Sequence, residues 1–248
     1  MNLYPAARRA LTILVLFATT SLAQAPRRPF TPVTDIEGLP RVLLLGDSIS
    51  IGYTIPTQDF LLGKANVHRP SVNCGPTTRG LEQLDKWLGD KPWDVIHFNF
   101  GLHDLKYISD DGKLVDVDKG KQQVPPAEYE KNLTQIVERL KATNAKLIWR
   151  NTTPVPVGAK GRVPGDAVKY NDIALRVMKN TGVDQFDDLH KFATAKLQQI
   201  QQKANVHFTP AGSKQLALQV AKKIERLLPT PETKSQTATG VVLSLIHI

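Results

Sequence analysis

The alternation of short apolar runs with longer amphipathic stretches constrains the fold of this chain more than any other feature. Arg41–Leu45, Val95–Phe100 and Lys146–Trp149 are short, mostly apolar runs typical of buried parallel strands, and residues 183–186 form a shorter one. Helical spacing of apolar residues predicts helices over residues 81–88, 126–140, 166–179 and 211–227. Right-handed crossovers then place helices on both faces of a parallel sheet, so the sequence predicts an α/β fold.

Small and polar residues cluster where these predicted strands end. The clusters are Gly46-Asp47-Ser48, Asn73-Cys74-Gly75, Gly101-Leu102-His103-Asp104 and Asn151-Thr152-Thr153. Reactive groups in parallel sheets gather at the carboxyl ends of the strands. We therefore expect these clusters to meet at one edge of the sheet and to form the functional site.

Ser48 and His207 are the candidates for chemistry. Ser48 follows the first strand at a predicted helix start, where backbone amides favour developing negative charge, although Asp47 and Ser48 can also simply cap that helix. His207 lies just before the last helix and can meet Ser48 across the sheet edge. Serine needs such a base to become a nucleophile. Gly-x-Ser-x-Gly and the glycine-rich phosphate motifs are absent from the sequence.

Four blocks of the sequence resemble, in order, those of SGNH hydrolases, the GDSL esterases and lipases. The blocks are Gly46-Asp47-Ser48, Gly75, Gly101-Leu102-His103-Asp104 and Val206-His207-Phe208-Thr209-Pro210-Ala211-Gly212. The resemblance spans residues 41–228 and implies a flavodoxin-like α/β/α sandwich that hydrolyses carboxylic esters, commonly short acyl groups on carbohydrates. It also implies that Ser48 attacks the acyl carbonyl, that His207 takes the serine proton, and that the amides of Ser48 and Gly75 hold the oxyanion.

Two positions depart from the family pattern. His103 replaces the usual asparagine of the third block, and its imidazole can donate to the oxyanion instead or merely order the loop. Ala204 replaces the aspartate that usually stands three residues before the histidine, so Asn205 or a backbone carbonyl has to orient His207. We expect structural support from Asp47, Asp104 and Asn205. Two functions stay open: a working serine esterase, and a catalytically impaired relative that binds carbohydrate.

Composition limits the partners of this protein. The net charge is +9, but lysine and arginine are interleaved with acidic residues, without a basic stripe or stacking aromatic residues, so nucleic-acid binding is not expected. Metal-binding motifs are absent and Cys74 is the only cysteine, so we expect no metal, no cofactor and no intramolecular disulfide. The expected partner is a small-molecule or carbohydrate ester. The sequence carries no signal for an oligomeric state.

The two ends of the chain are expected to lie outside the hydrolase domain. Arg8-Arg9, the apolar residues 10–18 and Ser21-Leu22-Ala23 are typical of a signal peptide, which predicts a periplasmic or secreted protein. No later segment reaches about 18 apolar residues, so no stable membrane span is expected. Leu243–Ile248 back-translates to the end of a sequencing adapter. The expected divisions are a signal peptide at 1–23, a linker at 24–40, the SGNH hydrolase domain at 41–229, and a disordered or artefactual tail at 230–248.

Overall fold

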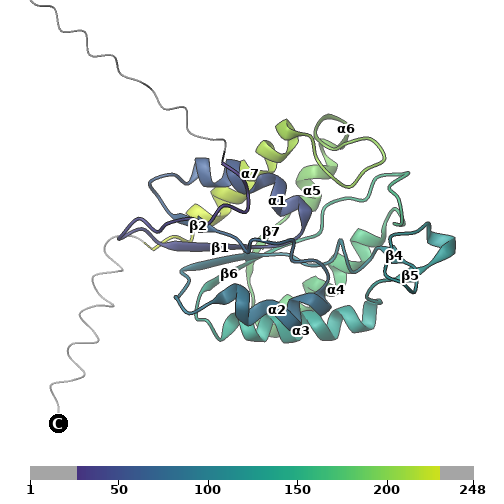
Figure 1. Ribbon diagram of the computed structural model, residues 1–248, viewed down its shortest axis with the longest axis horizontal. Helices are drawn as coiled ribbons and strands as arrows, with labels where there is room; N and C mark the ends of the chain where they lie inside the picture. Colours follow the sequence, from purple (N-terminus) through teal and green to yellow (C-terminus); the bar gives the residue numbers. More distant parts are fainter. Residues whose placement is uncertain (1–26, 230–248) are drawn as a thin grey trace, which may run out of the picture.

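A computed structural model describes residues 27–229, which form a five-stranded parallel sheet between two layers of helices (Figure 1). The strands lie in the order β2-β1-β3-β6-β7. They are β1 (Arg41–Leu45), β2 (Asn66–His68), β3 (Val95–Phe98), β6 (Lys146–Arg150) and β7 (Gln185–Asp187). This order is that of flavodoxin-like doubly wound sheets, in which the crevice for ligands lies between β1 and β3.

Helices cover both faces of the sheet, which confirms the predicted α/β/α sandwich. Figure 1 shows α1, α5, α6 and α7 on one face and α2, α3 and α4 on the other. The helices are α1 (Ser48–Phe60), α2 (Thr77–Leu88), α3 (Pro126–Lys141), α4 (Asp166–Thr181), α5 (Leu189–Thr194), α6 (Leu197–Ile200) and α7 (Pro210–Glu225). A hairpin of β4 (Tyr107–Ile108) and β5 (Lys121–Gln122), with the 3-10 helix η1 (Val117–Lys119) between them, extends from the sandwich.

The core explains why the central strands are apolar throughout. Val42–Leu45 are at most 1% exposed, because helices cover both faces of β1. Each such leucine or valine stabilises the fold by about 1.5–3 kcal/mol through burial. On α7 the fully buried residues Leu216, Val220 and Ile224 recur every four positions and face the sheet. The helix that carries Ser48 and the one that follows His207 pack against each other on the same face.

Several elements differ from the prediction. The cluster Asn73-Cys74-Gly75 was expected directly after a strand, but β2 ends at His68 and residues 69–72 intervene before Asn73. The short β2, the β4–β5 hairpin, α5 and α6 were not predicted, because two to six residues are too few to show a period. The strand expected at Val95–Phe100 ends at Phe98.

The segment before β1 lies against the sheet edge. The Ile36 amide donates to Asn66 Oδ1 over 2.9 Å, and Asn66 Nδ2 donates back to the Ile36 carbonyl. Asp35 pairs with His68 at 2.6 Å. The expected signal peptide and the expected tail lie outside the described residues. Within residues 27–229, no helix combines the length and apolar character that crossing a membrane requires.

Candidate active site

Ser48 lies just after the carboxyl end of β1, at the point where the strand order reverses. Asp47 caps α1, with its Oδ1 accepting from the Ile49 amide over 3.0 Å, and Ser48 is the first residue of the helix. The capping role therefore belongs to Asp47, which leaves the Ser48 hydroxyl available for other contacts. The amide of Ser48 has no acceptor within the helix, because the first amides of a helix lack one.

The structure brings His207 to Ser48 although 159 residues separate them. Nε2 of His207 lies 2.8 Å from Ser48 Oγ, and the ring is exposed to solvent. The loop that carries His207 is fixed on its carboxyl side, where the Thr209 amide donates to the Ile200 carbonyl over 2.9 Å. The Thr209 side chain also caps α7 by accepting from the Gly212 amide.

Asn205 orients the imidazole of His207. Its Oδ1 lies 2.8 Å from His207 Nδ1 and also accepts from the His207 amide over 3.0 Å. Its Nδ2 donates to Gln202 Oε1 over 3.1 Å, and Gln202 Nε2 donates to the Phe208 carbonyl over 3.2 Å. Because a carbonyl can only accept, this chain fixes both amide directions and puts the imidazole proton on Nδ1. Nε2 is then free to accept the Ser48 hydroxyl proton.

Ala204 contributes nothing to this arrangement. Its backbone is left-handed, with φ of 52°, and its methyl group borders Gly158. The position that usually supplies the acid thus borders Gly158, and its neighbour Asn205 supplies the acceptor.

Gly75 reaches the same edge of the sheet, but its amide is already paired. The Cys74 amide donates to the Gly46 carbonyl over 3.2 Å and so joins this loop to the end of β1. Gly75 has a φ of 68°, and its amide donates to Asn73 Oδ1 over 2.9 Å. An oxyanion contact from Gly75 therefore requires that its N–H be shared with, or released from, the Asn73 side chain.

Asp104 supports the third loop. Its Oδ1 accepts from the amide of Thr77 over 2.7 Å and from the Thr77 hydroxyl over 2.5 Å, which ties the loop to the start of α2. Burial raises the pKa of Asp104 to about 6 in spite of these hydrogen bonds. Gly101 opens the loop with φ of 140°, and a Cβ there would lie 2.3 Å from Thr152 Oγ1, so no larger residue fits.

His103 is held as a neutral imidazole. Burial, reinforced by the charges of Lys106 and Arg162 and opposed by that of Asp47, lowers the pKa of His103 to about 4. Lys106 Nζ lies 3.4 Å from Nδ1, and an ammonium group can only donate. The ring proton is therefore on Nε2, which makes His103 a neutral N–H donor at physiological pH.

We expect acid to destabilise the wild-type protein more than a His103→Asn variant. Between pH 6.5 and about 4 the unfolded chain binds a proton at His103 that the native protein does not bind. The free energy of unfolding at this site therefore falls as the pH falls through this window, by at most about 3 kcal/mol. Denaturant titrations of both proteins at about pH 7 and about pH 4.5 measure the difference. An equal loss in both proteins would contradict the lowered pKa.

Four residues near the site were not singled out from the sequence. Gln202 and Lys106 orient Asn205 and His103 as described. Arg162 Nε donates to the Leu102 carbonyl over 3.3 Å, and the fully buried Arg150 lies 3.7 Å from Asp47 Oδ1. A charged residue that ends an apolar strand is a signal that points to Arg150; the other three depend on loop conformation.

Other candidates take structural roles. Asn151, Thr152 and Thr153 are buried, and Asn151 bridges Asp188 and the His190 amide instead of facing a substrate. Cys74 is buried, and burial raises the pKa of its thiol to about 11. Among residues 27–229, no three His, Cys, Asp or Glu side chains are grouped so that they could hold a metal ion.

A groove of about 600 Å³ opens beside the two candidate oxyanion residues Gly75 and His103. Its surface is predominantly polar. The lining residues are Asn73, Gly75, Pro76, Thr78, Arg79, Glu82, Gln83, His103, Lys106 and Gln123.

Comparisons with known proteins concern the family and the fold of this chain. The model of the GDSL-like lipase/acylhydrolase family matches residues 44–215. The lipase/acylhydrolase from Enterococcus faecalis has a similar structure, at a TM-score of 0.62 and 18% identity, over 77% of this chain and 98% of that chain. Axe2, an acetylxylan esterase from Geobacillus stearothermophilus, matches at a TM-score of 0.61 and 16% identity over 75% and 94% of the two chains. At such identities these structures establish a shared fold. The comparison with curated proteins finds no match.

Proposed function

This chain belongs to the GDSL-like lipase/acylhydrolase family and is a carboxylic ester hydrolase, and we propose that it removes acetyl or other short acyl groups from carbohydrates through an acyl-enzyme on Ser48. The observation that carries this proposal is the 2.8 Å contact between Ser48 Oγ and Nε2 of His207. A hydroxyl held against an oriented imidazole is the arrangement that activates serine.

In the first half of the reaction, Ser48 Oγ attacks the acyl carbon while its proton moves to Nε2 of His207. The carbonyl oxygen becomes an oxyanion, for which the Ser48 amide and Nε2–H of His103 are the candidate donors. The C–O bond to the sugar then breaks, and His207 gives its proton to the departing alcohol. The acyl group is now an ester on Ser48.

In the second half, water attacks this ester and His207 takes the proton from the water. The tetrahedral intermediate collapses, the Ser48 oxygen regains a proton from His207, and the carboxylic acid leaves. During both halves Asn205 Oδ1 accepts from the Nδ1–H of His207, which keeps the ring in place. A neutral amide stabilises the imidazolium less than a carboxylate would, so this enzyme gives up part of that stabilisation.

The groove beside Gly75 and His103 supports the proposed substrate class. Its polar lining suits a hydroxyl-rich group better than a long acyl chain, which needs an apolar channel. Two of the solved structures that share the fold are acetylxylan esterases. Export, as the pattern of residues 1–23 predicts, would bring the enzyme to extracellular polysaccharide.

Hydrolysis assays with matched esters test this proposal. The protein is expected to release acetate from acetylated xylo-oligosaccharides and from p-nitrophenyl acetate, with a kcat/KM at least about tenfold higher than for p-nitrophenyl esters of long acyl chains. The long-chain esters are the control, because they have the same p-nitrophenol leaving group and differ from p-nitrophenyl acetate only in the acyl group. A preference for long chains would overturn the carbohydrate assignment, and inactivity on every ester would overturn the catalytic one.

Variants of Asn205 test how His207 is oriented. Asn205→Ala removes the acceptor at Nδ1, so we expect kcat to fall by about 10- to 100-fold with KM nearly unchanged. Asn205→Asp keeps an acceptor and adds charge, so it is expected to retain or raise kcat, since Gln202 can turn its amide to donate. If Asn205→Ala were as active as the wild type, Asn205 would have no part in orienting the ring.

A further inference from the structure

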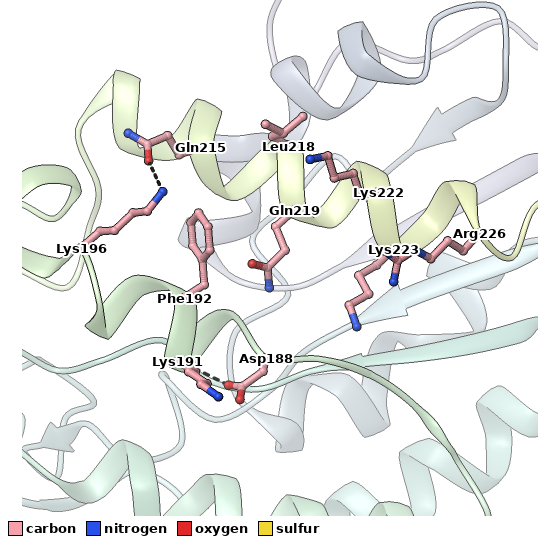
Figure 2. A pocket seen from close by; sticks show the side chains of 10 residues that line it. All are labelled: Asp188, Lys191, Phe192, Lys196, Gln215, Leu218, Gln219, Lys222, Lys223 and Arg226. Carbon is pink, nitrogen blue, oxygen red and sulfur yellow. Dashed lines mark hydrogen bonds between the residues drawn. The ribbon is translucent and has the colours of Figure 1, made fainter.

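A second groove, of about 610 Å³, lies between α5 and α7 (Figure 2). Five of its lining residues are cationic and one is acidic. The complete lining is Asp188, Lys191, Phe192, Lys196, Gln215, Leu218, Gln219, Lys222, Lys223 and Arg226. None of these residues belongs to the candidate active site.

The positive charge of this groove is not neutralised within the described part of the chain. None of its five cationic side chains lies within 4.0 Å of a carboxylate among residues 27–229. Asp188 accepts from the Lys191 amide and from Asn151 Nδ2. Glu225, the nearest acidic residue on α7, pairs with Lys64 at 2.5 Å instead. A groove with five cationic side chains and a single carboxylate, which already accepts two hydrogen bonds, attracts negatively charged ligands.

The shape of the groove favours a linear occupant. Lys191 and Lys196 come from the α5–α6 segment and Lys222, Lys223 and Arg226 from α7, so the two walls of the groove both carry charge (Figure 2). From Gln215 to Arg226 the lining of α7 extends about 16 Å. A polymer lying in the groove can contact both walls, whereas a flat membrane surface meets only the rims.

The scarcity of aromatic residues in the lining also limits which polymers can bind in the groove. Phe192 is the only aromatic residue of the lining, and Lys196 Nζ lies 4.6 Å from its ring centroid. Proteins that bind single-stranded nucleic acids combine a basic groove with aromatic rings on which successive bases stack, and here the one ring is covered. A polymer whose negative charge comes from sugar carboxylates needs no such ring.

One end of the groove lies on the part of α7 that is nearer to the catalytic residues. α7 begins at Pro210, three residues after His207, and Gln215 lies about 8 Å further along the helix. We propose that this groove binds an acidic polysaccharide, one with uronic acid residues, and so holds acylated chains close to Ser48. Binding in the groove would help catalysis because a tethered chain presents its esters to Ser48 at a raised local concentration. That benefit rests on the proposed function.

Binding to an unesterified polymer tests the groove independently of catalysis. At low salt, polygalacturonate is expected to slow the migration of the wild-type protein in affinity electrophoresis, whereas neutral xylan is expected not to slow it. The variant Lys222→Gln/Lys223→Gln/Arg226→Gln should bind at least about tenfold more weakly, and added salt should abolish binding by the wild type. The activity of this triple variant on p-nitrophenyl acetate should stay at the wild-type level.

A matched control removes three charges elsewhere. Lys86, Lys131 and Lys179 are exposed on α2, α3 and α4, on the opposite face of the sheet, and their triple change to glutamine should leave polygalacturonate binding intact. Equal weakening in both triple variants would overturn the proposal, because net charge alone would then explain binding. Tighter binding of single-stranded DNA than of polygalacturonate would overturn it as well. Inactivity on all esters would instead contradict the proposed function and leave this binding result standing.

Discussion

Replacing Ser48 with alanine is expected to lower kcat for ester hydrolysis by about 10⁴- to 10⁶-fold, because the acyl-enzyme can no longer form. The melting temperature should stay close to that of the wild type. The Ser48 hydroxyl contacts His207 at the exposed edge of the site, so its removal leaves no buried polar group without a partner. Initial rates with p-nitrophenyl acetate and thermal unfolding curves measure the two effects.

Ser50 is the matched control for this substitution. It is buried, donates to the Asp47 carbonyl over 2.8 Å and accepts from Arg69 over 3.0 Å. Ser50→Ala is therefore expected to lower the melting temperature while the folded protein keeps its activity. Wild-type turnover by Ser48→Ala would contradict the assignment of the nucleophile.

The second large effect is expected at His103. If its Nε2–H donates to the oxyanion, His103→Ala should lower kcat by about 10²-fold or more with little change in KM, since the contact forms only as charge develops. The neutral state of the ring fits this role, because a donor with a pKa of about 4 does not titrate near neutral pH.

His103→Asn separates donation from loop structure. Its side-chain amide can also donate, so this variant should retain more activity than His103→Ala under the same conditions. Equal kcat values for the wild type and both variants would reduce His103 to a structural role in the loop that Asp104 ties to α2.

The sandwich and its main strands could be predicted because burial on both faces makes β1 and β6 continuous apolar runs. The pairing of Ser48 with His207 could be predicted as well, since the α/β topology brings strand ends and the last helix start to one edge. Strand β2 could not, because three residues at the sheet edge with two polar side chains show no period.

The details of the site depend on contacts that no local pattern encodes. Gln202 and the Phe208 carbonyl determine that the Asn205 carbonyl oxygen faces the imidazole, and they do so through the conformation of one loop. The hydrogen bond from the Gly75 amide to the Asn73 side chain likewise depends on the conformation of its loop. The low pKa of His103 comes first from burial, and the charges of Lys106, three positions away, and of Arg162, remote in sequence, lower it further.

Labelling with a fluorophosphonate probe is the most direct test that Ser48 is the nucleophile, because the probe reacts with activated serines in the folded protein. Digestion and mass spectrometry locate the modified residue. We predict a single adduct on Ser48 in the wild-type protein, and no adduct in Ser48→Ala or after denaturation. Labelling on Ser50 or another serine, or no labelling of a protein that hydrolyses esters, would contradict it.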